Sequence, residues 1–410
     1  MSHLPPGWDL VSLNDLQADE PRAITDGPFG SSLTSAHYTK HGPRVVRLQK
    51  IGDGRFVDAH AHISHQHFES LRAHEVLAGD LLVASLGDDP PRACLAPSTL
   101  GPAIVKADCI RARLAPSVDP RWVLYALQTP AVRKWASEKM YGVGRPRLGL
   151  KTIRAISIPL SPLDEQRRIV EILEDHLSHL DAAERTVAAA ARRLELWGLS
   201  SLWHETHYHQ GSASRLAEVA EVRLGRQRSP LNHSGPRMRP YLRAANVHWD
   251  RLRLDDVKEM HFSSSEESGL AFQEGDILVV EASGSRREVG KSAVYRGEVP
   301  GACFQNTLLR VRVSGANPDF IQKYLLAEAW AGRLAKESRG VGIHHIGRAR
   351  LAALPVALPS IEAQRDSVVR ASSALEALER ARESLAAHHV RADKLRRSLL
   401  TAAFSGRLTR

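Results

Sequence analysis

The chain has 410 residues, about two to three times the length of a typical domain, so we expect more than one hydrophobic core. Its 43% hydrophobic and 25% charged residues are ordinary for a folded protein and exclude wholesale disorder. The net charge of +10 favours an anionic partner such as nucleic acid, because basic surfaces neutralise phosphates, although charge alone does not decide the partner.

Membrane, secretory and disulfide-stabilised classes are not expected. No apolar run approaches the roughly 20 residues that a spanning helix needs. The start, MSHLPPGWDL, lacks the basic and apolar regions of a secretory signal. Cys94, Cys109 and Cys303 are too few and too scattered for a disulfide framework or a thiolate metal site. We therefore expect a cytoplasmic protein with no membrane partner.

Residues 1–160 are predicted to form one α+β module with long loops. Short β-type runs at Val45–Leu48, Leu81–Ser85 and Ala103–Val105 predict strands, because Gly, Pro, Asp and Ser separate them. The segment Arg121–Glu138 follows a proline and predicts a helix.

Residues 161–208 are predicted to form a long central helix, since no Pro or Gly occurs between Pro162 and Gly198. Apolar residues alternate at spacings of four and three, which is typical of a coiled-coil seam. The predicted seam residues are Ile169, Leu173, His176, Leu180, Ala183, Val187, Ala190, Leu194 and Trp197.

Residues 209–357 predict a second α+β module. Its β-type runs are Ile277–Glu281, Ala293–Tyr295 and Leu308–Val313, and Asp319–Lys336 predicts its helix. Residues 358–410 predict a second long helix with a short tail. Its seam comprises Ala371, Leu375, Leu378, Ala381, Leu385, His388, Ala392, Leu395 and Leu399. Each helix would be about 60 Å long, and the two can bury their apolar stripes against each other.

The two halves of the chain repeat one another. Gly142 and Gly340 are separated by the same interval as Gln166 and Gln364. The Gly-Asp-hydrophobic-Leu motif at 79–82 recurs at 275–278, and Val46–Ile51 matches Leu242–Val247. Ordered matches at a nearly constant interval indicate duplication of a unit. Because DNA repeats its accessible groove about every 34 Å, two unlike modules on a helical spacer could read an asymmetric, two-part site.

The chain resembles the specificity subunits of type I restriction–modification systems. The resemblance covers the whole chain and rests on Leu4-Pro-Pro-Gly-Trp8, Asp26-Gly-Pro-Phe-Gly-Ser31, the two Gly-Asp motifs, Pro159–Val170 and Leu395–Leu408. It implies two target-recognition domains in a pseudo-twofold tandem repeat, separated by two long antiparallel coiled-coil helices. It also implies double-stranded DNA, two methyltransferase subunits and restriction subunits as partners.

The resemblance implies no catalytic residue, cofactor or metal in this chain. S-adenosylmethionine, ATP and Mg²⁺ are expected on the partner subunits only. The sequence departs from strict symmetry at three places, one of which is the end of the central helix, where Leu199–Glu205 is not a copy of Ala403–Arg407. Ala363 replaces Glu165 before the repeated Gln, and the second half shows no counterpart of Gly27–Gly30.

Candidate DNA contacts lie in loops rich in Arg, Lys, Asn and Gln, since these side chains can bond phosphates and base edges. In the first module they are Arg44, Arg47, Gln49, Lys50, Tyr141, Arg145 and Arg147. In the second module they are Tyr241, Arg243, Asn246, Arg286, Arg287, Lys291, His344, His345 and Arg348. Apolar residues left over from the seam, Ile172, Leu177, Leu196 and Trp203, are candidate contacts to partner subunits.

Other functional interpretations are weaker. Asp88-Asp-Pro-Pro-Arg92 lacks the aromatic ring that an adenine methyltransferase motif needs. Gly340-Val-Gly-Ile-His-His345 lacks the third glycine of a dinucleotide fingerprint, and His204 and His207 are one residue too close for a zincin helix. The alternatives left open are a modification-only or other phage-defence specificity subunit, an enzyme acting on DNA, and a scaffold without DNA affinity.

Overall fold

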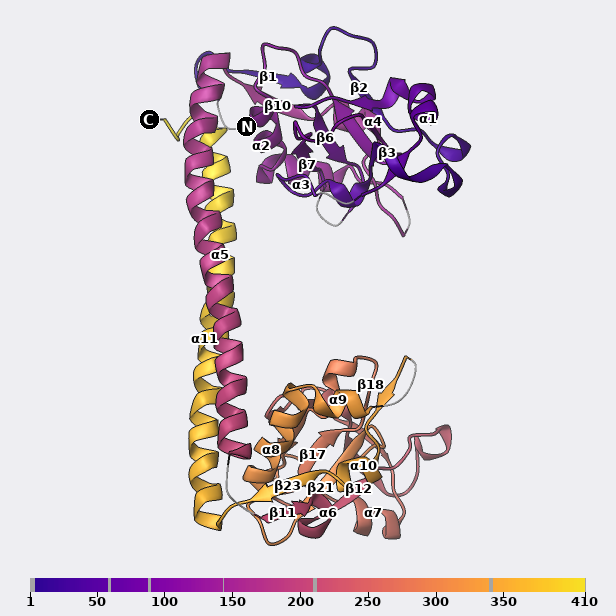
Figure 1. Ribbon diagram of the computed structural model, residues 1–410, viewed down its shortest axis with the longest axis vertical. Coiled ribbons are helices and arrows are strands. Elements are labelled where there is room, and N and C mark those ends of the chain that lie inside the picture. Colours follow the sequence, from indigo (N-terminus) through magenta and orange to yellow (C-terminus); the bar gives the residue numbers. More distant parts are fainter. Residues whose placement is uncertain are drawn as a thin grey trace. The chain divides into compact units, whose positions relative to one another are not determined.

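The computed structural model describes residues 4–57, 60–87, 90–142, 144–208, 212–338 and 342–409. Its contacts divide the chain into two compact units, of which unit 1 holds Met1–Thr186 with Ala387–Arg410 and unit 2 holds Val187–Ala386. Each unit has one globular module and part of each of two long helices, α5 (Leu163–His207) and α11 (Ile361–Ala403) (Figure 1). We call the part before α5 module 1 and the part between the long helices module 2.

In its described residues, module 1 has a four-stranded sheet in the order β2-β9-β6-β7 and a second in the order β4-β3-β8-β5. The first sheet is antiparallel, whereas β3 and β8 are parallel, and β1 pairs with β10 in a separate ribbon. The strands are β1 (Asp9–Ser12), β2 (Ile24–Asp26), β3 (Tyr38–Val46), β4 (His62–Ile63), β5 (Glu75–Val76), β6 (Leu81–Ala84), β7 (Arg92–Leu95), β8 (Ala103–Val105), β9 (Cys109–Ala112) and β10 (Ser157–Leu160).

The helices of module 1 are α1 (His65–Ser70), α2 (Pro120–Leu127), α3 (Pro130–Glu138) and α4 (Leu150–Arg154). The single helix predicted at 121–138 is therefore wrong. It is interrupted before Pro130, because proline has no N–H to continue α2 and Thr129 caps a new helix through its side chain. The core of module 1 includes the end of the chain, where Phe404 packs on Trp122 with ring centroids 4.4 Å apart.

Module 2 repeats this plan with the sheet orders β12-β21-β17-β19 and β16-β13-β20 and the ribbon β11-β23. The strands are β11 (Ser212–Arg215), β12 (Ala220–Leu224), β13 (Met238–Leu242), β14 (Val247–His248), β15 (Arg251–Leu252), β16 (Lys258–His261), β17 (Ile277–Val280), β18 (Ala282–Ser283), β19 (Ser292–Val294), β20 (Cys303–Phe304), β21 (Leu308–Val313), β22 (His344–His345) and β23 (Pro355–Leu358). The helices are α6 (Leu216–Val219), α7 (Ser264–Leu270), α8 (Pro318–Trp330), α9 (Arg333–Glu337) and α10 (Arg348–Ala352).

The repeated Gln residues join each module to its long helix. Gln166 accepts from the backbone N–H of Asp119 at 3.0 Å and donates to the Ser161 carbonyl at 2.7 Å. Gln364 accepts from the N–H of Asn317 at 2.8 Å in the same way. Asp119 and Asn317 are the N-caps of α2 and α8. The repeat found in the sequence is thus a structural joint built twice.

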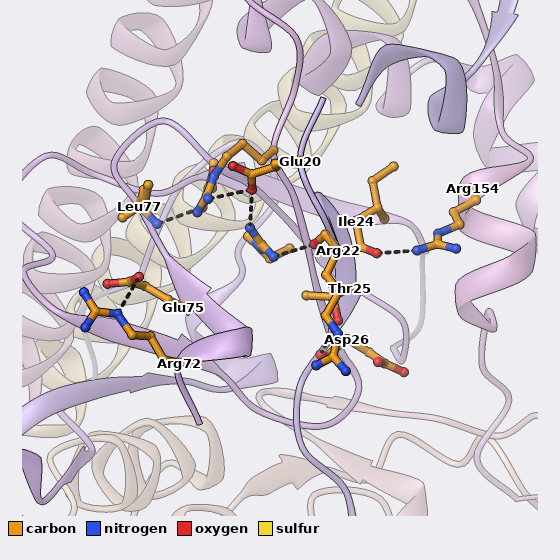
Figure 2. Close-up of polar contacts among 12 residues, drawn as sticks. Glu20, Arg22, Ile24, Thr25, Asp26, Arg72, Glu75, Leu77 and Arg154 are labelled. Atoms are coloured by element: carbon orange, nitrogen blue, oxygen red, sulfur yellow. Dashed lines mark hydrogen bonds and ion pairs between the residues drawn. The ribbon is translucent and has the colours of Figure 1, made fainter. Parts of the chain in front are cut away.

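The repeated Gly-Asp motif places a buried carboxylate at the start of a central strand. Asp80 receives two hydrogen bonds from Arg113, both 2.9 Å, and Asp276 receives two from Arg312, both 2.7 Å. Arg113 also donates to Glu20 at 2.7 Å, and Figure 2 shows Glu20 among the polar contacts near β2. The hydrogen bonds with Asp80 raise the pKa of the Arg113 guanidinium. Each Gly-Asp motif therefore anchors the start of a central strand through an Asp–Arg ion pair.

The long helices run antiparallel within each unit, because the residue numbers of the contacting residues on α11 decrease as those on α5 increase. The contacts in order are Asp181 with Arg396 in unit 1, then Glu195 with Arg382, Gly198 with Leu378 and Glu205 with Arg370 in unit 2. The fold class of two α+β modules with two long antiparallel helices is confirmed.

The seam predicted on α5 is wrong by one residue at several positions. Trp197 is 48% exposed and His176 is exposed, whereas Leu177 is buried. Gly198 takes the inward position beside Leu378, whose Cδ2 would lie 2.8 Å from a Cβ built on the glycine. On α11 the predicted residues Ala371, Leu375, Leu378 and Ala392 are buried, but His388 and Leu395 are exposed.

The domain boundaries at residues 160, 208 and 357 stay predictions, since the compact units divide the chain within the long helices rather than at their ends. In the part of the chain that the structure describes, no helix is both long enough and apolar enough to cross a membrane.

Candidate nucleic-acid interface

The predicted DNA-contacting loops of module 1 meet at one edge of its first sheet, where β6 ends and β9 begins. The backbone N–H of Ser85 donates to Asp108 O at 3.0 Å, and that of Leu148 donates to Ser85 O at 2.8 Å. The N–H of Lys106 donates to Val46 O at 2.8 Å, which brings in the end of β3. We call the segments 44–50, 85–87, 106–108 and 144–148 the loop edge of module 1.

Module 2 builds the same edge with the same backbone hydrogen bonds. The N–H of Glu281 donates to Thr307 O at 2.9 Å, that of Ile346 to Glu281 O at 3.0 Å, and that of Gln305 to Leu242 O at 2.9 Å. The segments 243–246, 281–291, 305–307 and 344–348 form the loop edge of module 2. The chain thus brings together loops that the sequence analysis could select only by composition.

A glycine lets two strands approach at each loop edge. A Cβ on Gly27 would lie 2.2 Å from the backbone of Lys106, and one on Gly225 would lie 2.3 Å from the backbone of Gln305. Module 2 therefore does have a counterpart of Gly27, contrary to the sequence analysis. The rest of the 27–30 motif is not repeated, because Gly225 is followed by Arg226-Gln-Arg228.

Eight of the predicted DNA contacts have exposed side chains and four are half-buried. The exposed residues are Gln49, Tyr141, Arg145, Arg147, Arg286, Arg287, His345 and Arg348. The half-buried residues are Arg44, Arg47, Arg243 and His344. Several of these twelve are also engaged in the fold, since Arg286 donates to the Ala335 carbonyl at 2.7 Å, Arg243 pairs with Asp256 and His345 bonds Glu281 at 2.9 Å.

Three predicted contacts in module 2 are corrected because their side chains lie inside it. Tyr241 is 1% exposed and belongs to the hydrophobic core. Asn246 is 2% exposed, and its amide donates to two backbone carbonyls at 2.9 and 3.1 Å. Lys291 is buried with its amine bonded to Glu288. Buried and satisfied side chains do not reach a ligand, so these residues are removed from the candidate interface.

Lys50 is also buried, but it is not satisfied. Its side chain is 0% exposed at the end of the 3-10 helix η4 (Leu48–Lys50), and its Nζ has no hydrogen-bond partner among the described residues. Burial, together with the nearby positive charges of Arg44 and Arg47, lowers the pKa of this amine to about 8. Asn246, which ends the equivalent 3-10 helix η7 (Ala244–Asn246), is neutral. The direct DNA contact predicted for Lys50 is therefore corrected, and the residue adds positive charge from behind the surface.

The sequence analysis missed Arg92, which begins β7 beside the loop edge of module 1. Its guanidinium would lie 3.3 Å from a Cβ built on Gly87. Lys291, the residue just before β19, holds the equivalent position in module 2. In the sequence, Arg92 stands at the end of the Asp88–Arg92 segment, which lacks the aromatic ring of a methyltransferase motif. Aligning the two halves by their strands would have paired it with Lys291 and so identified it.

The predicted partner contacts differ in exposure. Leu196 is 63% exposed on α5, and Ile172 is half-buried. Leu177 is 5% exposed in the core of module 1, so its assignment as a partner contact is corrected. Trp203 is half-buried, with His207 stacked at 3.6 Å and the guanidinium of Arg333 at 4.2 Å from its ring centroid. Trp197, next to Leu196, is an exposed aromatic residue that the sequence analysis had placed in the seam.

The enzyme-like patterns gain no support from geometry. In the described residues, no group of three or more His, Cys, Asp and Glu side chains could hold a metal ion. His204 stacks on Tyr208, and His207 bonds Glu328 at 2.9 Å, so these two histidines have separate partners. Asp88, Asp89, Gly340 and Val341 lie outside the described residues.

Comparison with known proteins finds a family model that matches part of the chain. The model of the type I restriction modification DNA specificity domain matches residues 108–189. The EcoKI specificity subunit of the type I restriction enzyme from Escherichia coli (strain K12) is 24% identical over an alignment of 271 residues, and the match covers 62% of this chain. The match spans 58% of that relative's length, less than two thirds.

Two solved structures share the fold over nearly the whole chain, each at 19% identity. A chain from work on complex assembly and conformational transition of the type I R-M system has a TM-score of 0.74, covering 99% of this chain and 100% of that one. The HsdS subunit from Thermoanaerobacter tengcongensis has a TM-score of 0.53, covering 98% of both chains. The chain thus shares its fold with these two proteins, and it is similar in sequence to the type I restriction modification DNA specificity domain over residues 108–189 and to the EcoKI specificity subunit over 62% of its length.

Proposed function

We propose that the chain selects the DNA sequence on which a type I restriction–modification complex acts, and that it performs no chemical step itself. The observation that carries the proposal is the loop edge, which is built twice with the same backbone hydrogen bonds but with different side chains. Equivalent frames with unlike side chains suit the reading of two unlike half-sites.

The two half-sites would form one bipartite, asymmetric target in double-stranded DNA. α5 is continuous over 45 residues, or about 65 Å at 1.5 Å per residue. A paired, uninterrupted helix resists bending, so we infer that it fixes the number of unread base pairs between the half-sites. The excess of basic residues, 56 against 46 acidic, would supply phosphate contacts along the way.

We further propose that two methyltransferase subunits, and restriction subunits with them, dock on the helical part of the chain. Leu196 and Trp197 are neighbouring exposed apolar residues on α5, and exposed apolar surface commonly marks a protein interface. Within unit 2, a groove of about 1010 Å³ between module 2 and α11 is lined by Trp249, Trp330 and Leu375 among others. S-adenosylmethionine, ATP and Mg²⁺ would be bound by those partner subunits.

A gel-shift salt titration with the full-length chain tests DNA binding. We expect affinity to fall steeply and linearly on a log–log plot as salt rises, because each neutralised phosphate releases counterions. A chain that binds no duplex at low salt would support the scaffold alternative instead. Incubation with duplex, labelled S-adenosylmethionine and Mg²⁺ should give neither methyl transfer nor cleavage, and either product would identify an enzyme.

A further inference from the structure

Arg147 and His345 occupy the same position in the two loop edges. In module 1, Arg147 forms an antiparallel bridge with Leu86, and the next N–H, of Leu148, donates to Ser85 O at 2.8 Å. In module 2, His345 pairs antiparallel with Ala282, and the next N–H, of Ile346, donates to Glu281 O at 3.0 Å. The backbone therefore places the two side chains at equivalent points of the two loop edges.

Arg147 offers hydrogen-bond donors only. Its side chain is 48% exposed, and the central carbon of its guanidinium lies over the Tyr141 ring, 5.5 Å from the ring centroid. Among the described residues, its ion-pair partner is Asp108, whose Oδ1 is 3.9 Å from Nη1, which is too far for a hydrogen bond. In the described part of the chain the guanidinium thus makes no hydrogen bond, while Tyr141 and Asp108 limit its orientation. A planar, oriented pair of donors matches the O6 and N7 acceptors of guanine.

His345 offers different chemistry at the same place. Its Nδ1 lies 2.9 Å from Oε2 of Glu281, whose side chain is only 9% exposed. An ionised carboxylate can only accept, so Nδ1 carries the proton of this hydrogen bond. In the neutral ring, Nε2 then presents a lone pair on the half-exposed side chain. Such an acceptor matches the exocyclic amino group of adenine or cytosine in the major groove.

We propose that Arg147 and His345 are equivalent base-reading residues, Arg147 for a guanine and His345 for a base that presents an exocyclic amino group. Glu281 is the positioning residue that fixes the tautomer of His345, and Asp108 and Tyr141 position Arg147. This inference rests on the proposed function, because it assigns the DNA chemistry of the same loop edges.

The test selects duplexes from a pool with a randomised central segment, using the full-length chain and its variants, and sequences the bound fraction. Arg147→Lys keeps the charge but removes the paired donors, so it should lose discrimination for guanine at one base pair about ten- to hundredfold. The half-site read by module 2 should stay unchanged. His345→Phe should relax one base pair in that other half-site only.

Glu281→Gln tests the tautomer separately. An amide can either donate or accept, so both tautomers of His345 become allowed and the preference at that base pair should broaden while binding persists. Arg22→Gln is the matched control in module 1, since Arg22 is exposed just before β2, at the opposite end of the sheet. Arg296→Gln is the control in module 2, where Arg296 pairs with Asp319 beyond the far end of β19. Neither control should alter the selected bases.

The outcomes separate the two proposals. Variants that bind all sequences uniformly more weakly, with the selected bases unchanged, would make these residues phosphate contacts and overturn the inference alone. A wild-type chain that enriches no sequence at all would overturn the proposed function. Far-UV circular dichroism and thermal melting confirm that each variant is folded, and Arg147→Ala provides a second variant if Arg147→Lys melts early.

Discussion

Replacing Lys50 by methionine should stabilise the protein at neutral pH. The methionine keeps an unbranched apolar stem but removes the buried, unpartnered amine. The pKa of that amine is lowered from 10.5 to about 8, and each unit is equivalent to 1.36 kcal/mol between the two protonation states. The charged amine therefore costs the folded state about 3 kcal/mol, which the Lys50→Met variant should recover in large part.

The pH dependence gives the sign of the effect. Below pH 8 the amine is charged in both the folded and the unfolded chain, so the cost is fully present. Between about pH 8 and 10.5 the unfolded chain binds more protons than the folded one, so the stability of the wild type rises with pH. The advantage of Lys50→Met should therefore be largest near pH 7 and shrink through this window.

Urea unfolding followed by far-UV circular dichroism measures this at pH 7 and at several values up to 10.5. The control is Lys134→Met, at an exposed lysine of α3, which should shift stability by no more than about 0.5 kcal/mol. Equal stability of the Lys50→Met variant and wild type at pH 7, or a difference that does not change with pH, would refute the burial argument.

Three further predictions concern the joints, the loop edge and DNA affinity. Gln166→Ala should lower stability by about 2–4 kcal/mol, because the buried N–H of Asp119 and the carbonyl of Ser161 lose their partner; thermal melting measures this, and an unchanged melting temperature would contradict the joint. Gly225→Ala should reduce DNA binding and stability together, because a Cβ there would meet backbone at 2.3 Å. The same change at Gly315, which has open space but a left-handed φ of 81°, should cost only about 1–2 kcal/mol of backbone strain and leave DNA binding unchanged in the same melting and gel-shift assays. Arg287→Gln should weaken binding and lower the salt slope by about one if its exposed side chain contacts a phosphate, and a slope equal to wild type would exclude that contact.

The repeat, the two long helices and the mixed modules could be predicted because each depends on patterns along the chain. The interval between Gln166 and Gln364 is meaningful because both side chains bond the cap of the helix before them. The helix seam was less accessible. Trp197 is hydrophobic enough for the interior of the helix pair, but the close approach of Leu378 favours Gly198 at that position. Such packing depends on both helices, so the sequence of one helix does not predict it.

The candidate site was predictable as a set of loops but not residue by residue. Tyr241 and Arg243 are close in sequence and similarly suited to DNA, yet Tyr241 enters the core and Arg243 is half-buried beside Asp256. Strand pairing decides which side chain faces outward, and pairing is not visible in composition. The equivalence of Arg147 and His345 was hidden for the same reason, because it depends on their bridges to Leu86 and Ala282.

Mapping methylated bases in the DNA of a host that carries this system, with and without an intact copy of the chain, tests the central claim most directly. The account predicts one methylated motif of two unlike base blocks at a constant separation, and its disappearance when the chain is deleted. Methylation that persists without the chain, or a motif made of a single uninterrupted block, would contradict a two-module reader.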